Sequence, residues 1–137
     1  MDIASYSGIG PIKLGMSPEE ARAAVGQPYR SVTRSGKLTD QFPSIGVLVH
    51  YGASGRAEAV EVGERGVATF RAKQLLGQPY SDLMVWFKNL DANLQENDTG
   101  FTSTALGIGV YAPHARKDRE APVEGVIVFE QGYYSRK

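Results

Sequence analysis

The stretch SPEEARAAVGQP carries both the start and the stop signals of a short helix. Ser17 is a natural N-cap, Pro18 stands where its missing N–H does no harm, and Glu20 completes the capping box S-x-x-E. Gly26 supplies the left-handed residue after the last turn, and the proline two positions later cannot continue a helix. The sequence therefore predicts a helix over residues 18–25.

A second helix is predicted after a repeat of the tetrapeptide GQPY, which occurs at the exit of the first helix and again at residues 77–80. Here the proline opens a helix, because apolar residues at the spacing i, i+3, i+4, i+7 come after it. These residues are Leu83, Trp86, Phe87 and Leu90. Since the two copies have opposite roles, the repeated tetrapeptide is a coincidence.

Two similar halves are indicated when the chain is compared with itself in another register. Leu14-Gly15 and Leu76-Gly77 each lead into a proline-started helix, and extended sequence follows both helices. We therefore expect a single domain, residues 1–137, with a first α-then-β half (residues 1–65) and a second one (residues 66–137). A chain of this length is long enough to bury a core of its own.

Apolar runs after each predicted helix indicate β-strands. In the first half, IGVLVHY and RAEAVEV flank a Gly-Ser turn and indicate a hairpin; in the second half the runs are FTSTALGIGVYAP and VEGVIVFEQGYY. The predicted fold class is α+β, with an antiparallel sheet of about six to seven strands and two short helices packed on one face. The predicted core consists of Val25, Val47, Val49, Val60, Leu83, Trp86, Phe87, Leu90, Leu106, Ile108 and Val110.

The composition narrows the possible partners and the compartment. Lys plus Arg and Asp plus Glu number 15 each, so the formal net charge is zero and the chain has no general attraction for nucleic acid. The absence of cysteine excludes disulfides and thiolate sites and fits a reducing compartment. The N-terminal segment lacks a basic start followed by an apolar run, and no stretch has the length of a membrane span. We expect a cytoplasmic protein with no nucleic-acid or membrane partner.

Signatures of catalysis and of metal binding are absent from the sequence. His50 and His114 have no third ligand at the spacing of a metal site, and DANLQENDTG lacks the glycine and the final glutamate of a calcium loop. No glycine-rich stretch extends to a phosphate-binding motif, and no serine stands in G-x-S-x-G. We therefore expect no metal, no cofactor and no catalytic residue.

The residues around the first helix carry a resemblance to a known repeat. The pattern I-x-x-G-M-S at Ile12–Ser17, a short helix, and then G-x-P resembles the opening of the repeat unit shared by the β-lactamase inhibitory protein and the small outer-membrane-assembly lipoproteins. With the hairpin that follows, the resemblance covers about residues 9–62. It implies helices packed on one continuous, curved antiparallel sheet built from two units, in a protein that holds another protein. It carries over no binding residue.

The sequence favours a small, non-catalytic protein-binding module of the inhibitor or immunity-protein kind. One alternative is a small enzyme in which His50 acts with a carboxylate such as Glu58 or Glu130. The other is a carrier that holds a small ligand in a sheet-lined pocket near His50.

A binding face is predicted from the strand alternation in ALGIGVYAP. If Leu106, Ile108 and Val110 face the helices, then Gly107, Gly109 and Tyr111 face the other way. The sheet surface there is almost bare of side chains. Alternating glycines in a strand suggest either close approach by another backbone or a place where a bulky group lies flat. The candidate binding residues are Leu48, His50, Gly107, Gly109, Tyr111, Val126, Val128, Tyr133 and Tyr134. The expected partner is another protein or a second copy in a homodimer, unless the chain's own N-terminal segment covers the face.

Overall fold

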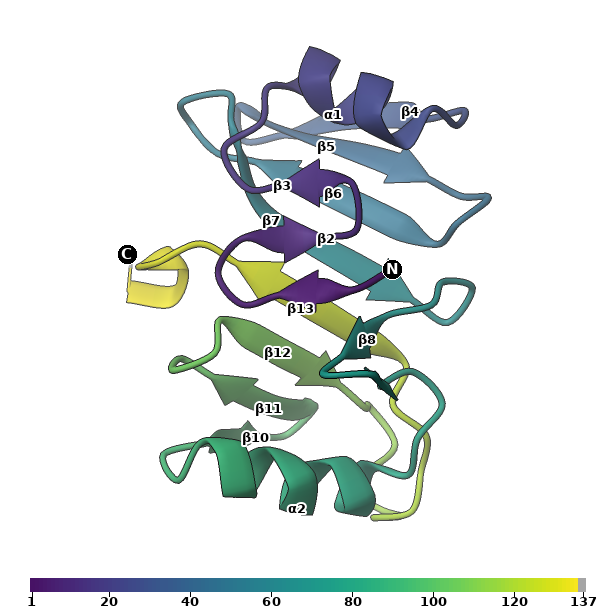
Figure 1. Cartoon of the computed structure of the whole chain (residues 1–137), viewed down its shortest axis with the longest axis vertical. Helices are drawn as coiled ribbons and strands as arrows, with labels where there is room; N and C mark the ends of the chain where they lie inside the picture. Colours follow the sequence, from purple (N-terminus) through teal and green to yellow (C-terminus); the bar gives the residue numbers. More distant parts are fainter. Residues whose placement is uncertain (136–137) are drawn as a thin grey trace.

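A computed structural model describes residues 1–135, and it is dominated by a single large antiparallel sheet (Figure 1). Within that range the helical elements are α1 (Pro18–Val25), α2 (Tyr80–Leu90) and the short 3-10 helix η1 (Tyr133–Ser135). The protein is α+β, and most of its regular structure is sheet. Among residues 1–135, no helix is long and apolar enough to cross a membrane.

The main sheet has eight strands, and every neighbouring pair in it is antiparallel. From one edge to the other they are β10 (Gln95–Asn97), β11 (Gly100–Ser103), β12 (Ile108–Tyr111), β13 (Gly125–Phe129), β7 (Ala57–Gly63), β6 (Val47–Tyr51), β5 (Lys37–Phe42) and β4 (Arg30–Arg34). Each α-helix is therefore followed by a meander of four strands. The last strands of the two meanders, β7 and β13, pair at the centre of the sheet.

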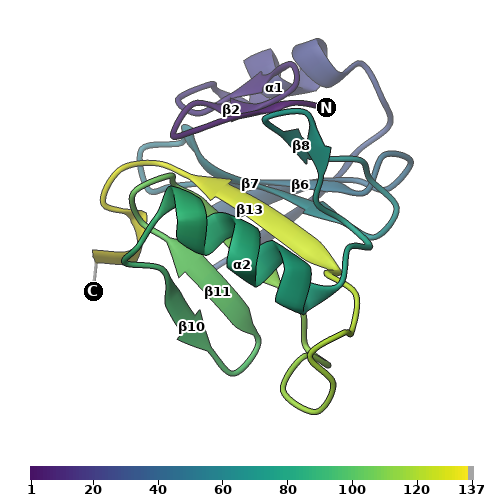
Figure 2. The same ribbon diagram turned by 60° about the horizontal axis from the view of Figure 1, so that its bottom comes forward.

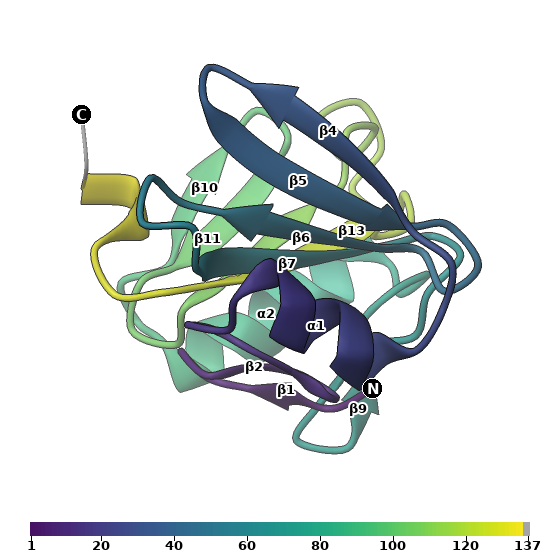
Figure 3. The same ribbon diagram turned by 90° about the horizontal axis from the view of Figure 1, so that it is seen from above.

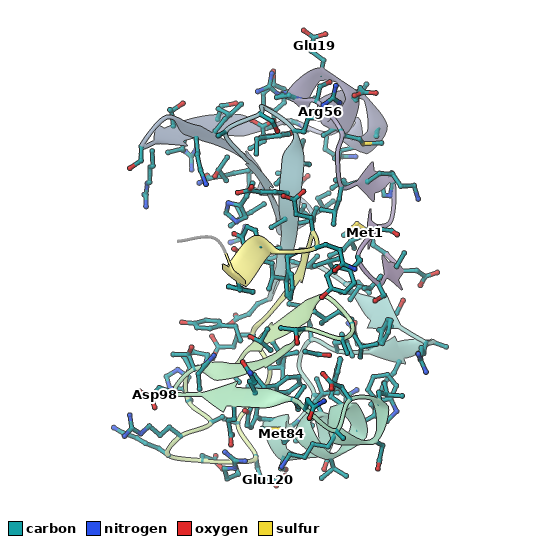
Figure 4. All side chains as sticks on the ribbon, turned by 90° about the vertical axis from the view of Figure 1, so that its left-hand side faces the viewer. Met1, Glu19, Arg56, Met84, Asp98 and Glu120 are labelled. Atoms are coloured by element: carbon teal, nitrogen blue, oxygen red, sulfur yellow. The ribbon has the colours of Figure 1, made fainter. Side chains whose placement is uncertain are left out.

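Two smaller sheets lie on the same side of the main sheet as the helices (Figures 1 and 4). One consists of β1 (Ile3–Ala4), β2 (Gly8–Ile9) and β3 (Ile12–Lys13), and the other of β8 (Thr69–Phe70) and β9 (Lys73–Gln74). The predicted fold class is wrong in this respect: it had one sheet of six to seven strands, whereas the structure has eight in the main sheet and five more in the smaller ones. These five strands have only two residues each, which is too short for the alternation of inward and outward residues that identifies a strand in a sequence.

The start and the end of α1 follow the local signals. The Oγ of Ser17 accepts a hydrogen bond from the backbone N–H of Glu20 at 3.2 Å, and a carboxylate oxygen of Glu20 accepts one from the N–H of Ser17 at 2.9 Å. Gly26 ends the helix in the left-handed region, with φ 65°. The predicted bounds of this helix are confirmed.

Helix α2 begins without a side-chain cap. Its first N–H groups are instead satisfied from the loop between β12 and β13: Tyr80 donates to the carbonyl of Ala121 and Ser81 to that of Arg119, both at 2.9 Å. Figure 2 shows α2 lying across the second meander. A long-range contact thus replaces the capping box that begins α1.

The core lies between the main sheet and the layer of helices and small sheets (Figure 3). Seven of the predicted core residues are buried, namely Val47, Val49, Val60, Leu83, Phe87, Ile108 and Val110. Four others, Val25, Trp86, Leu90 and Leu106, are partly buried and pack against its edge. Trp86 contacts Phe70 and Phe87 edge-on, and the ammonium group of Lys73 lies over its ring. It is therefore at the edge of the core.

Candidate functional site

One face of the main sheet is not covered by α1, α2 or the small sheets, and we call it the outer face. The sheet curves, so that β4–β5 at one end and β10–β11 at the other reach forward on this side, and η1 lies against the middle (Figure 4). This face belongs to an eight-stranded sheet, and the chain covers it only in part, so we consider it as a candidate binding surface.

Strand pairing decides which of the predicted residues lie on the outer face. Ile108 and Val110 are buried toward the helices, so Gly109 and Tyr111 point outward as predicted. Leu48 and His50 also lie on the outer face, because Val47 and Val49 beside them point into the core.

Val126 and Val128 do not belong to the outer face. They are 2% and 0% exposed, and they pair with the core residues Val62 and Val60 of β7. The outward positions of β13 are Gly125, Ile127 and Phe129. The sequence GVIVF is apolar throughout and carries no alternation that would show which residues face outward.

Gly107 is covered by the N-terminal segment. It lies in the turn before β12 with φ 70°, and a Cβ on it would lie 2.7 Å from the Cδ1 of Tyr6. The Tyr6 hydroxyl donates a hydrogen bond to the carbonyl of Thr104 in the same turn. The N-terminal segment, one of the alternatives considered for covering the glycine-rich face, therefore contacts the turn that contains Gly107.

A groove of about 480 Å³ crosses the outer face where the two meanders meet. Its floor contains Gly63, Gly125 and Gly109, of which Gly63 and Gly125 are direct cross-strand partners. Beside Gly109, the space that a side chain would take is filled by the Cγ2 of Ile127, 2.7 Å from an ideal Cβ. A Cβ added at Gly63 would lie 3.8 Å from the carbonyl oxygen of Gly46, which is an ordinary van der Waals contact, so the floor accepts a side chain there.

Tyrosines border this groove. Tyr111 and Tyr134 both line it, and each is 50% exposed. The ring of Tyr134 is held by an edge-on contact with the buried ring of Phe129 at 4.8 Å, and Tyr133 stacks on the same ring at 5.8 Å. Phe129, which was absent from the predicted site, thus anchors η1 against the sheet.

Carboxylates supply the charge of the groove. Glu61 and Glu124 line it, and among residues 1–135 its lining contains no Lys, Arg or His. A hydrogen bond with the side chain of Glu64 raises the pKa of Glu124, and burial and the negative charge of Glu64 act in the same direction, against the weaker opposite effect of His114. The Nε2 of His114 lies 3.7 Å from the Glu124 carboxylate.

A second hollow, of about 370 Å³, lies beyond Tyr134 and is lined by Lys37, Thr39, His50, Tyr51, Glu58, Tyr133 and Tyr134. Both ring nitrogens of His50 have partners on neighbouring strands: Nδ1 lies 3.0 Å from the Thr39 hydroxyl, and Nε2 lies 2.7 Å from a Glu61 carboxylate oxygen. The carboxylate that lies next to His50 Nε2 is that of Glu61, which the sequence did not single out, while Glu58 lines the same hollow as His50.

Thr39, His50 and Glu61 lie on three neighbouring strands, and their contacts join a hydroxyl to an imidazole and the imidazole to a carboxylate. It can pass a proton, but acyl transfer also needs free N–H donors for the oxyanion. Strand β5 is paired with β4 on one side and β6 on the other, so its backbone N–H groups are engaged in the ladders. The arrangement is a polar cross-strand ladder that fixes the orientation of Glu61.

The part of the chain that the structure describes contains no group of three or more His, Cys, Asp or Glu side chains placed to hold a metal ion.

A third hollow, of about 310 Å³, lies beside Tyr80, Glu96 and Arg119. There the Glu96 carboxylate accepts hydrogen bonds from Tyr80 at 2.8 Å and from Arg119 at 2.6 Å. These bonds tie α2 and the loop before β13 to the edge strand β10.

No family model, curated protein or solved structure matches this chain. The function is therefore argued from the outer face. Alternation in VEVG could have identified Glu61 and Gly63 as outward residues, since the valines at 60 and 62 alternate with them. Glu124, Gly125 and Ile127 had no such signal, because their orientation depends on the pairing of β13 with β7 and β12.

Proposed function

We propose that the protein is a small, non-catalytic protein-binding module of the inhibitor or immunity-protein kind, and that it holds its partner on the outer face. The observation that carries this proposal is the groove where the two meanders meet: its floor is glycine, and half-exposed tyrosines border it. Glycines let another backbone approach the sheet closely. Tyrosines are rigid and amphipathic, and they are common anchors of protein interfaces.

The shape of this surface favours a protein segment as the occupant. Tyr134 lines both the groove and the second hollow, so an extended chain that passes this residue would have contacts in both. A formal net charge of zero gives no support to a polyanion as the partner. The resemblance of residues 9–62 to a repeat unit of proteins that hold other proteins supports the same function. The absence of cysteine fits a site of action in the cytoplasm.

The test places a photo-reactive residue, p-benzoylphenylalanine, at Tyr111 in the cells that naturally make the protein. Val85, 63% exposed on the helix side of the sheet, is the matched control position. We expect one protein to cross-link at position 111 and not at position 85, and the purified pair to re-form the complex. Gly63→Thr, which fills the floor of the groove, should abolish this cross-link while the protein stays folded.

Two outcomes would overturn the proposal. Equal cross-linking at positions 85 and 111, or an unchanged cross-link in folded Gly63→Thr, would place the contact elsewhere. A cross-link at position 111 to a second copy of the same chain, with a dimer in analytical ultracentrifugation, would replace a separate partner by self-association.

A further inference from the structure

The groove combines negative charge with exposed aromatic rings. Among residues 1–135, its titratable lining consists of Glu61, Glu124 and the two tyrosines Tyr111 and Tyr134. Carboxylates and aromatic faces attract the same kind of group, because both present negative potential to a cation. The groove has a volume of about 480 Å³ and Gly63 in its lining carries no side chain, so a side chain of the partner has room to lie flat between them.

Glu61 is held in place from the side. His50 Nε2 lies 2.7 Å from one of its oxygens, and the other ring nitrogen of His50 is fixed by Thr39 at 3.0 Å. A carboxylate that is already oriented loses less conformational freedom when it binds a planar, multidentate donor. Arg offers such a donor in its guanidinium group.

Glu124 gives a second, separate reason to expect a cation. Its carboxyl group lies beside that of Glu64, and the hydrogen bond and repulsion between the two raise the pKa of Glu124. His114 is the basic neighbour that faces this pair, at 3.7 Å from Glu124, and its side chain is mostly exposed. An arriving cation would be attracted by the negative charge that this pair of carboxyl groups carries.

We propose that the groove recognises an arginine side chain presented by an extended segment of the partner protein, with the guanidinium lying between Tyr111 and the carboxylates of Glu61 and Glu124. The backbone that flanks this arginine lies over Gly63 and Gly125. The inference rests on the proposed function and names the chemistry of the partner. An arginine-bearing loop satisfies both the charge of the groove and the close backbone approach that its floor permits.

The probe is the tripeptide acetyl-Gly-Arg-Gly-amide, and its neutral counterpart has norleucine in place of arginine. Both are titrated into the full chain labelled with nitrogen-15. We expect the arginine peptide to shift the backbone amide signals of Gly63, Gly109 and Gly125, and the norleucine peptide to leave them unchanged. Glu61→Gln and Glu124→Gln should each weaken binding by roughly fivefold, the fold-change of about 1 kcal/mol for one partly exposed ion pair.

Glu19→Gln is the matched control, because Glu19 is an exposed carboxylate on α1, on the far side of the sheet (Figure 4). It should bind the arginine peptide as the wild-type chain does. Equal shifts with the norleucine peptide, or wild-type binding by the folded Glu61→Gln and Glu124→Gln chains, would overturn the inference.

The same variants separate this inference from the proposed function. If the double variant Glu61→Gln/Glu124→Gln still cross-links its partner at position 111 with the wild-type yield, the partner binds the outer face without an arginine. The function would then stand, and the inference would fall. Loss of the cross-link in the double variant but not in Glu19→Gln supports both.

Discussion

The guanidinium of Arg22 on α1 donates two hydrogen bonds to the buried carboxylate of Asp40 on β5, at 2.8 and 3.0 Å. Asp40 is 0% exposed, and it also accepts hydrogen bonds from the hydroxyl groups of Ser31 at 2.6 Å and Tyr51 at 3.0 Å. The guanidinium lies over the ring of Tyr29 at 4.4 Å. This network joins α1 to the first meander.

Removing Arg22 should therefore destabilise the protein strongly. Arg22→Ala leaves the carboxylate of Asp40 buried without its cation, which should lower the free energy of unfolding by about 3 kcal/mol. Arg30→Ala, which removes a hydrogen bond between exposed side chains of β4 and β5, should change it by about 0.5 kcal/mol or less. Urea unfolding of both variants measures the difference. Equal, small effects would show that the buried ion pair contributes little.

The same network predicts how stability depends on pH. Burial by itself raises the pKa of Asp40, but the hydrogen bonds from Arg22, Ser31 and Tyr51, together with the charge of Arg22, outweigh it and hold the pKa below its ordinary value of 3.8. A carboxyl group with a lowered pKa in the folded state stabilises that state above its unfolded pKa, and loses this contribution as the pH falls through the folded pKa.

Acid titration should reveal this contribution. The free energy of unfolding should fall below about pH 4 in the wild-type chain, and it should fall less steeply in Asp40→Asn, which has no proton to take up at this position. Urea unfolding at a series of pH values measures the two slopes. Parallel slopes would mean that other carboxyl groups account for the acid sensitivity.

The glycines of the outer face should differ sharply in their tolerance to substitution. Gly63→Thr should leave stability unchanged or raise it by up to about 1 kcal/mol, because the strand backbone is extended there and a β-branched residue suits it. A Cβ at Gly100 would lie 1.8 Å from the carbonyl oxygen of Val110, so Gly100→Ala should cost about 2 kcal/mol or more. Thermal melting of the two variants compares them directly.

Neighbouring aromatic residues of α2 should also contribute unequally. Phe87 is fully buried and stacks on Phe70, so Phe87→Ala should cost about 3 to 5 kcal/mol. Trp86 lies at the edge of the core, and Trp86→Ala should cost about 2 kcal/mol, less than its position in the helical stripe suggested. Unfolding of both variants should be followed by circular dichroism, because Trp86 is the only tryptophan and Trp86→Ala therefore has no tryptophan fluorescence to follow. A larger loss for Trp86 would place it in the core after all.

Local signals in the sequence determined the elements whose hydrogen bonds close within a few residues. The capping box at Ser17 and Glu20 and the left-handed Gly26 set the bounds of α1, because each donor and acceptor lies within one turn of its partner. Alternation in LGIGVY likewise set the inward direction of Ile108 and Val110.

The size of the sheet and the composition of the groove were decided by the tertiary structure. GVIVF is apolar at every position, and its outward residues, Gly125, Ile127 and Phe129, are defined only when β13 pairs with β7 and β12. The short strands β1 to β3 exist because they pair with one another over the core. Likewise, His50 and Glu61 meet because β6 and β7 pair in one register, and a shift of one residue would put them on opposite faces. Pairing between distant segments depends on the burial of the whole apolar surface, and no window of a few residues contains that information.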